Sequence, residues 1–309
     1  YPNQRQLWPN FKSPLMWDVL AVTTYLLVSS MFFYLGLLPD IAAARDRSTG
    51  WRKKFYTILS LNWQGKSPTW RHYRKAFLLF AALATPLVVS VHSVVSWDFA
   101  ISILPGWHST IFAPYFVAGA IHSGLAMVLT LLIPMRMLFK VKHIITMRHL
   151  EYMAKIIIVT GLIVGYSYVV EYFIAYYSAN VYEQAIFGYR PTGAYAWAFW
   201  IMIICNSVVP LLFLFKRFRT SIFWLFTVSI LVNVGMWFER FVIIVTSLAH
   251  DFLPYAWGNY RPSPVELMIL VGSFAWFFLL FLLFSKHLPS ISMTEVKELL
   301  PPPEEEKAK

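Results

Sequence analysis

Seven long runs of mostly apolar residues divide this sequence of 309 residues, and they restrict its fold more than any other feature. A helix needs roughly 20 such residues to cross the hydrocarbon core of a bilayer, which is about 30 Å thick. Only 13% of the residues are charged and 58% are hydrophobic, whereas an ordinary soluble domain has about 25% charged residues. The sequence therefore predicts an all-α polytopic membrane protein and excludes a soluble enzyme. The predicted spans are about 15–38, 75–104, 111–138, 151–178, 195–215, 220–248 and 264–286.

The single cysteine, Cys205, limits the redox chemistry that this chain can carry by itself. One cysteine cannot form an intramolecular disulfide, a cysteine-based zinc site or a cysteine-ligated iron–sulfur cluster. The sequence also lacks a phosphate loop and a nucleotide fingerprint, so we expect neither a metal site nor a nucleotide site. Because the sequence begins with Tyr1 and a polar stretch, we expect Tyr1 to lie inside a longer natural chain.

Lys and Arg residues are distributed very unequally between the connections. Of the 26 Lys and Arg residues, 21 fall in or at the edges of the connections after the first, third and fifth spans and of the C-terminal tail. Cytoplasmic loops of membrane proteins carry such an excess of positive charge. We therefore expect the N-terminus of this chain outside and its C-terminus in the cytoplasm. The net charge of +11 then reflects membrane orientation, not nucleic-acid binding.

The connections on the predicted outer side are rich in aromatic residues. Two interpretations stay open, because Trp and Tyr are typical of the lipid headgroup region and also of protein interfaces. These residues form either a headgroup belt or a docking surface for an extracytoplasmic partner. They are Trp97, Trp107, Tyr182, Tyr189, Trp257 and Tyr260.

Ionisable side chains within the predicted spans are the main candidates for function. An acid at the centre of a spanning helix costs about 2.5–3.5 kcal/mol on insertion scales, so such residues are usually paired or functional. The candidates in this chain are Asp18, His92, Asp98, His122, Glu171, Glu239 and Arg240.

Asp18 and Asp98 lie near the predicted outer ends of the first two spans. Asp18 is at a helix N-terminus, where the helix dipole favours a carboxylate. A purely structural role for Asp18 therefore explains its position as well as a functional role does. Asp98 is near a helix C-terminus, where the dipole disfavours a carboxylate, and this favours a functional role. His92 lies six residues deeper, about 9 Å along the axis. With Ser93 and Ser96 between them, this half of the second span forms a polar ladder that leads toward water.

Such a ladder suits proton-coupled oxidation of a lipid-soluble hydroquinone. The reaction requires groups within hydrogen-bond reach that accept the two hydroxyl protons of the quinol, and a buried carboxylate and a histidine can do so. We therefore predict that Asp98 and His92 accept protons from a quinol. Aromatic side chains could form the flat apolar slot for the quinone ring, although interfacial packing explains each of them as well. They are Trp17, Tyr25, Trp97 and Trp107.

His92 and His122 also support a rival hypothesis. Both lie about three turns from the predicted outer ends of adjacent spans. Two histidines at equal depth could bind one haem axially, as in membrane cytochromes b. A second haem is excluded, because every other histidine lies in a predicted connection.

Glu171 and the neighbours Glu239 and Arg240 lie at similar depth in the fourth and sixth spans. Adjacent helical residues point about 100° apart, so we expect Arg240 to pair with Glu171 and not with Glu239. The pair is either a structural ion pair or part of a proton relay, with polar neighbours Tyr166, Ser167, Tyr168 and Asn233. A proton or solute transporter without redox chemistry, gated by Glu171, Glu239 and Arg240, is the alternative function.

Three stretches resemble the NrfD-like family of quinone-interacting membrane subunits. They are residues 7–18 (LWPNFKSPLMWD), 106–116 (GWHSTIFAPYF) and 237–241 (WFERF). Within that family the sequence is most similar to the larger such subunit of alternative complex III, a bacterial quinol-oxidising respiratory assembly.

This resemblance implies a fold of about ten spans in two four-helix bundles, so about three helices would precede Tyr1. Residues 1–104 would belong to the first bundle, residues 105–263 to the second, and residues 264–309 to the last span and tail. The resemblance also implies a subunit of the bacterial inner membrane that oxidises menaquinol or ubiquinol and carries no haem or iron–sulfur cluster of its own. Its implied partners are an extracytoplasmic iron–sulfur subunit, c-type cytochrome subunits, a second NrfD-like membrane subunit and a terminal oxidase.

The resemblance finally implies roles for the ionisable residues. Asp18, Asp98 and His92 would line the quinol pocket and its proton exit. A proton path through the second bundle would include His122, Glu171, Glu239 and Arg240.

Overall fold

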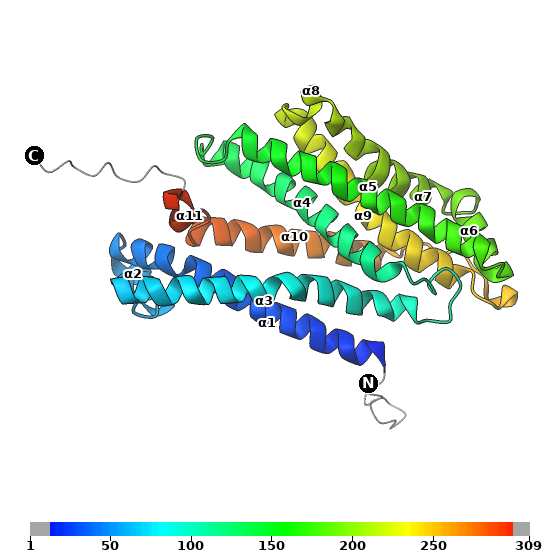
Figure 1. Cartoon of the computed structure of the whole chain (residues 1–309), viewed down its shortest axis with the longest axis horizontal. Coiled ribbons are helices and arrows are strands. Elements are labelled where there is room, and N and C mark those ends of the chain that lie inside the picture. The colour runs from blue at the N-terminus through cyan, green and yellow to red at the C-terminus, as the bar shows by residue number, and fades with distance from the viewer. Residues whose placement is uncertain (1–12, 299–309) are drawn as a thin grey trace, which may run out of the picture. The chain divides into compact units, whose positions relative to one another are not determined.

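The computed structural model describes residues 13–298, and within that range it is built from helices without a strand (Figure 1). Seven helices are long and apolar enough to cross a membrane, which confirms the predicted all-α polytopic fold. They are α1 (Pro14–Asp46), α3 (Ser67–Ala100), α4 (Phe112–Leu138), α5 (Met147–Tyr177), the segment Ala196–Leu214, α9 (Ile222–Ala249) and α10 (Pro264–His287).

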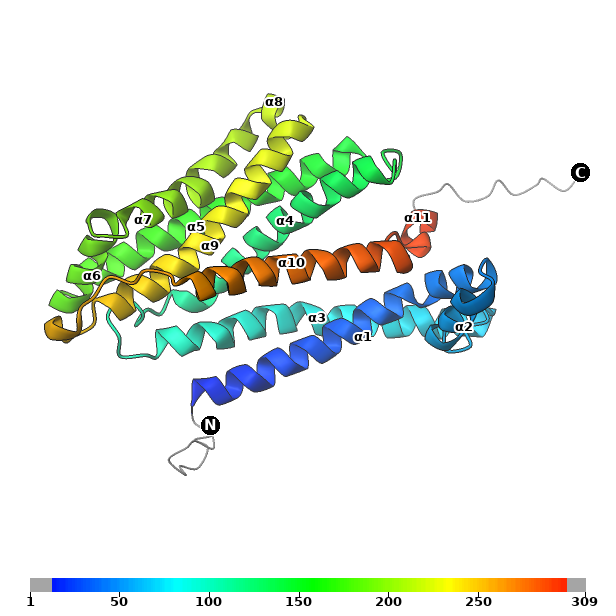
Figure 2. The same cartoon turned by 180° about the vertical axis from the view of Figure 1, so that it is seen from behind.

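The described part of the chain divides into two compact units, and the larger one contains residues 13–22 and 88–260. Its centre is a bundle of α4, α5, α9 and the segment Ala196–Leu214, which run side by side in both views (Figures 1 and 2). Two apolar clusters fill the bundle, one around Leu129 and Leu225 and the other around Phe112 and Val164. Buried polar side chains lie among these apolar residues, and they are described below.

The fifth span is not a continuous α-helix. It begins as α7 (Ala196–Ile203), widens into the π-helical turn η1 (Ile204–Val208) and ends as the 3₁₀ segment η2 (Val209–Leu214). Pro210 explains the change, because it has no N–H to donate to the carbonyl of Asn206 four residues earlier. π-Helical turns within α-helices are frequent at functional sites.

Two short helices lie in segments that we expected to be plain connections of this unit. One is α6 (Val181–Thr192), which begins where the Asn180 side chain accepts a hydrogen bond from the Tyr182 N–H at 3.0 Å. The other is α8 (Lys216–Arg219), a single turn that carries three basic residues. Helix α6 matters for the site, because it brings Glu183 and Arg190 against other elements.

The second unit contains residues 23–87 and 261–298. It includes most of α1, the surface helix α2 (Gly50–Leu59), the first part of α3, α10 and the short α11 (Met293–Glu298). Its core is small and consists of Ala42, Trp63 and Tyr73. Helix α1 continues through Pro39 and Asp40 to Asp46, so the prediction that the first span ends at residue 38 is wrong for the helix. Residues 39–42 are buried, and this packing stabilises the helix beyond the proline.

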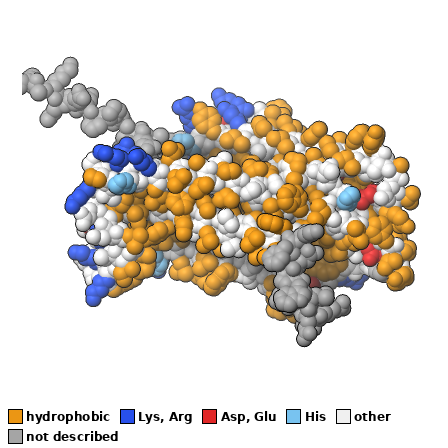
Figure 3. Space-filling view, turned by 60° about the horizontal axis from the view of Figure 1, so that its bottom comes forward, with side chains coloured by type: hydrophobic (Ala, Val, Ile, Leu, Met, Phe, Trp, Pro, Cys, Tyr) orange, Lys and Arg blue, Asp and Glu red, His pale blue; other side chains and the backbone are white. Residues whose placement is uncertain are grey.

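Apolar side chains dominate the face of the molecule in Figure 3, and Lys and Arg side chains gather at its margins. In α10 no residue is buried, and Leu267, Met268 and Trp276 are among its exposed apolar residues. Contact between such an apolar surface and water is unfavourable, whereas its contact with lipid tails or with an apolar protein surface is not.

Candidate functional site

Asp18 and Asp98 interact electrostatically in the larger unit. Asp18 lies in the second turn of α1, and Asp98 lies two residues before the end of α3. Their carboxylates are near enough to interact electrostatically. Each has a buried Oδ1 atom without a hydrogen-bond partner among residues 13–298. Two acids of separate spans thus lie within electrostatic range of each other, each with one buried oxygen that lacks a partner in the described residues.

His92 does not lie beside Asp98. Six residues along an α-helix correspond to about 9 Å and a rotation of about 240°, so the two side chains leave α3 on different faces. The Nδ1 atom of His92 is 2.7 Å from the carbonyl oxygen of Val88, so Nδ1–H donates there and Nε2 is left to accept a proton. The hydroxyls of Ser93 and Ser96 donate to carbonyls of their own helix, at 2.8 and 2.6 Å. The polar side chains between Asp98 and the middle of α3 thus form hydrogen bonds to the backbone of their own helix.

The four aromatic residues of the predicted slot differ in their surroundings. Trp17 and Trp97 are 54% and 44% exposed, so they are free to contact lipid or a ligand. Trp107 instead donates its indole N–H to the carbonyl of Ile243 at 2.7 Å and so joins its loop to α9. Tyr25 belongs to the smaller unit. The quinol role of these four residues stays a prediction.

Glu239 is the centre of a buried polar network within the bundle. The hydroxyl of Tyr168 donates to Oε2 of Glu239 at 2.6 Å, and the side-chain amide of Asn206 donates to that hydroxyl at 2.8 Å. Glu239 and Asn206 are completely buried, and Tyr168 is nearly so. The ring of Tyr115 packs edge-on against Tyr168, with centroids 5.6 Å apart. Gly235 permits this arrangement, because a Cβ atom there would overlap the Asn206 amide.

The ion pairs differ from the predicted ones. Arg240 does not face Glu171: its Nη2 lies 3.5 Å from Oε1 of the adjacent Glu239, and its guanidinium lies 3.9 Å from the centroid of the Phe116 ring. Glu171 instead faces Arg190 of α6, with 3.8 Å between Nη1 and Oε2. A long flexible arginine reaches its neighbour despite the 100° separation, and the helix that carries Arg190 was not predicted.

Arg190 and Glu183 together hold the loop between α3 and α4. Nη2 of Arg190 donates to the carbonyl of Gly106 at 3.0 Å, and the Gly106 N–H donates to Glu183 at 2.9 Å. Burial raises the pKa of Glu183 above its ordinary value. The hydrogen bond from the Gly106 N–H and the charge of Arg190 lower the pKa and offset only part of this rise. Arg190 thus connects this loop with the buried Glu171.

Gly106→Ala should loosen this connection. Gly106 has φ +82°, and a Cβ atom there would lie 2.8 Å from both Ile186 and Ser247 and 3.1 Å from Arg190. We expect the free energy of unfolding to fall by about 1–3 kcal/mol, measured by thermal unfolding in detergent. Gly188→Ala is the matched control, because its Cβ would meet nothing within 4 Å. Equal melting of the two variants would contradict this account.

His122 lies at the level of the π-helical turn. It is completely buried, its Nδ1 is 2.9 Å from the hydroxyl of Thr160, and its Nε2 has no hydrogen-bond partner among residues 13–298. The Cε1 atom of His122 and the carbonyl oxygen of Asn206 both lie 3.2 Å from the point where a Cβ of Gly161 would be. This glycine therefore lets the imidazole approach the carbonyl that Pro210 leaves without an α-helical donor.

A second polar cluster lies in the same bundle, toward the other end of α9. The side-chain amide of Asn233 donates to the hydroxyl of Thr130 at 3.0 Å, and that hydroxyl donates to Ser229 at 3.0 Å. Asn233 therefore belongs to this cluster and not to the network of Glu239. Tyr166, another predicted neighbour, is 65% exposed on the surface of α5.

Sequence reasoning missed several members of these networks. Arg190 lies in a predicted connection and Asn206 in an apolar span, and neither position marks its residue as part of a site. The sequence did contain a signal for Asn206, which lies four residues before Pro210 in an apolar run. Because proline has no N–H, the carbonyl of Asn206 lacks its usual helical donor. Thr160, Thr130 and Ser229 carried no such signal, since hydroxyl residues in spanning helices usually bond to their own backbone.

His250 predicts a pH dependence just beyond α9. Its ring lies between those of Tyr189 and Trp257, with centroid distances of 3.9 and 5.0 Å. Burial lowers the pKa of His250, so the unfolded segment binds a proton more readily than the folded one. Stability is therefore lost as the pH falls through the ordinary histidine pKa of about 6.5 and then through the lower folded value. Amides of residues 250–257 should exchange hydrogen faster at about pH 5 than at about pH 7.5, after correction for intrinsic rates.

His250→Phe should remove most of that difference, because phenylalanine keeps the ring contacts and cannot be protonated. Equal protection of the wild type at the two pH values would show that this histidine does not control the segment.

Comparisons with known proteins agree with this architecture. Residues 6–250 match the family described as polysulphide reductase, NrfD. A protein of Halobacterium salinarum named as a membrane subunit of dimethyl sulfoxide reductase is 26% identical over 85% of this chain and 62% of its own length. The Hdr-like menaquinol oxidoreductase integral membrane subunit of Archaeoglobus fulgidus is 25% identical over 73% of this chain and 61% of its own length. The chain thus spans about three fifths of the length of these curated relatives. The match over most of its length shows that the chain belongs to the NrfD polysulphide reductase family of membrane proteins.

Proposed function

We propose that this chain is the haem-free, quinol-binding membrane subunit of a respiratory complex that oxidises menaquinol or ubiquinol. The pair Asp18 and Asp98 carries the proposal. These carboxylates lie at the ends of two apolar helices, and no ion pair among residues 13–298 involves either of them. Two unpaired acids so placed can accept the two protons that leave a quinol when it is oxidised.

The relatives support the redox class of this function. One of them is named as a menaquinol oxidoreductase integral membrane subunit, and the other as a reductase membrane subunit. A membrane subunit without its own redox centre must pass the electrons to a partner. We propose an iron–sulfur subunit on the outer side as that partner, within an assembly of the alternative complex III type that also holds c-type cytochromes, a second NrfD-like subunit and a terminal oxidase.

In the proposed mechanism, the quinol lies near the outer ends of α1 and α3, beside the exposed rings of Trp17 and Trp97. Asp98 accepts the first proton, and Asp18 accepts the second or stabilises the charge that develops. His92 has a free Nε2 atom deeper in α3 and serves as a later acceptor. The network of Glu239, Tyr168 and Asn206 is proposed as the proton path of the bundle.

One observation favours a second function, a proton or solute transporter. Transporters build their sites where a spanning helix is interrupted, and the fifth span is interrupted at Ile204–Val208, beside His122 and the network of Glu239. This function needs Glu171, Glu239 and Arg240 as gates and needs no quinol.

Vesicles that contain the purified complex distinguish the two functions. The proposed function predicts quinol oxidation with a soluble electron acceptor, proton release on the side of Asp98, and no b-type band from this subunit in a reduced-minus-oxidised spectrum. The transporter predicts flux driven by an ion gradient without added quinol. Flux without quinol turnover would overturn the proposal.

A further inference from the structure

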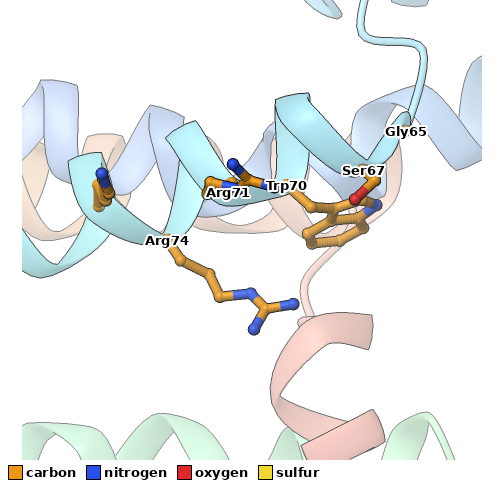
Figure 4. A pocket seen from close by; sticks show the side chains of 6 residues that line it. Gly65, Ser67, Trp70, Arg71 and Arg74 are labelled. Carbon is orange, nitrogen blue, oxygen red and sulfur yellow. The ribbon is translucent and has the colours of Figure 1, made fainter.

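A cavity lined by basic side chains opens in the smaller unit, where the chain enters α3. Its volume is about 590 Å³, and its lining consists of Gly65, Ser67, Trp70, Arg71, Arg74 and Lys75 (Figure 4). This volume is in the range of sites for small ligands. Arg74 and Trp70 project to the same side of α3 in Figure 4.

The lining residues other than Gly65 form one face of the first turns of α3. Residues three and four positions apart lie on the same side of a helix, and Arg71 precedes Arg74 and Lys75 by three and four residues. Like charges at this spacing destabilise a helix, so this arrangement is unfavourable unless an anion lies between them. No ion pair among residues 13–298 involves any of the three cations.

Another arginine of the same unit, Arg45, has hydrogen-bond acceptors within the protein. Arg45 donates to Asp46 at 2.8 Å, to the Ser60 hydroxyl at 3.2 Å and to the Trp63 carbonyl at 3.0 Å. The protein therefore supplies internal acceptors where a cation has a structural role. The cations of the cavity are exposed and have no such acceptors in the described part of the chain, so they are available to an anion from outside it.

The location of the cavity identifies the kind of anion. The excess of Lys and Arg predicts that this end of α3 faces the cytoplasm, and the apolar part of the span begins directly after Lys75. The ring of Trp70 packs edge-on against Trp63, with centroids 5.2 Å apart. Indole rings are enriched where spanning helices meet lipid headgroups. Basic pockets beside spanning helices on this side of a membrane bind anionic headgroups.

We propose that this cavity binds the phosphate group of an anionic phospholipid of the inner leaflet. Arg71, Arg74 and Lys75 hold the phosphate oxygens, and Ser67 donates its hydroxyl. The lipid stabilises the start of α3 by neutralising the cationic face. This proposal does not depend on the quinol reaction.

The test measures lipid binding to the full-length protein by native mass spectrometry after delipidation. Phosphatidylglycerol should bind, and phosphatidylcholine should bind far more weakly. Each basic residue near a membrane surface contributes about 1 kcal/mol, so R71Q/R74Q/K75Q should weaken phosphatidylglycerol binding by about 100-fold. R71K/R74K/K75R should retain binding and so show that the loss reflects charge and not misfolding.

The matched control is R52Q/K53Q/K54Q in α2, which removes the same charge from exposed residues outside the cavity. It should change the affinity by less than about threefold. Equal losses in the two glutamine variants, or no loss in R71Q/R74Q/K75Q, would overturn the proposal. A competition experiment with inorganic phosphate completes the test. If millimolar phosphate binds in the cavity and displaces phosphatidylglycerol, the ligand is a free anion and the lipid assignment is wrong.

Discussion

Asp98→Asn should nearly abolish quinol oxidation by the assembled complex. Asparagine keeps the size and polarity of the side chain but cannot take up the proton that leaves the quinol. Loss of one positioned proton acceptor costs about 10²–10⁴-fold in rate. The measurement is quinol turnover with a soluble electron acceptor, at saturating quinol, with complex assembly verified for each variant. The loss should appear in kcat and only weakly in KM, because the substitution removes a proton transfer and not a binding contact.

Asp18→Asn tests whether the two acids work together. Asp18 and Asp98 interact electrostatically, so the double variant should lose less activity than the product of the two single losses. Asp251→Asn is the matched control, since Asp251 is an acid outside the spans whose Oδ1 accepts the Leu253 N–H at 2.8 Å. Asparagine can accept the same bond, so turnover should not change. Turnover near wild type in Asp98→Asn would refute the assignment of the quinol site.

The spans could be predicted because lipid exposure leaves a signal that depends on composition alone. A run of apolar residues long enough for a bilayer is distinctive wherever its side chains point. The ends of the helices were less predictable, since they depend on local packing. Asp40 is an example: its carboxylate accepts the N–H of Met293 at 3.0 Å, and this contact between residues far apart in sequence belongs to the packing that stabilises α1 beyond Pro39.

The pairing of buried charges could not be predicted in the same way. Depth along a helix follows from residue number, but the direction of a side chain also depends on how the helices rotate and which connections fold back. Glu171 and Arg240 lie at similar depth, yet the partner of Glu171 is Arg190, from a connection that folds as α6. The depth of Asp18 and Asp98 was predictable, because both lie near the same predicted membrane surface on consecutive spans, but the direction of their side chains was not.

Glu239→Gln should separate electron transfer from proton movement across the bundle. Glu239 is completely buried between Tyr168, whose hydroxyl donates to it at 2.6 Å, and Arg240, so it is the acid best placed to relay a proton. Glutamine can keep a hydrogen bond with Tyr168 but cannot carry a proton and release it. In sealed vesicles we expect the protons moved per quinol to fall to those released by the quinol itself. Quinol oxidation in uncoupled vesicles should stay within about twofold of wild type, because the acids of the quinol site are unchanged.

Tyr168→Phe should have the same direction and a smaller effect, since it removes the hydroxyl between Asn206 and Glu239 and leaves the acid in place. Glu266→Gln is the control: this acid caps α10, where its carboxylate accepts the Ser263 N–H at 2.6 Å, and glutamine serves the same cap. It should move protons as wild type does.

If Glu239→Gln retains the wild-type number of protons per quinol, the bundle has no proton path through this residue, and its buried network only stabilises the packing of α5, α9 and the interrupted fifth span. A matched loss of proton movement and quinol oxidation would instead show that Glu239 acts on the quinol reaction itself.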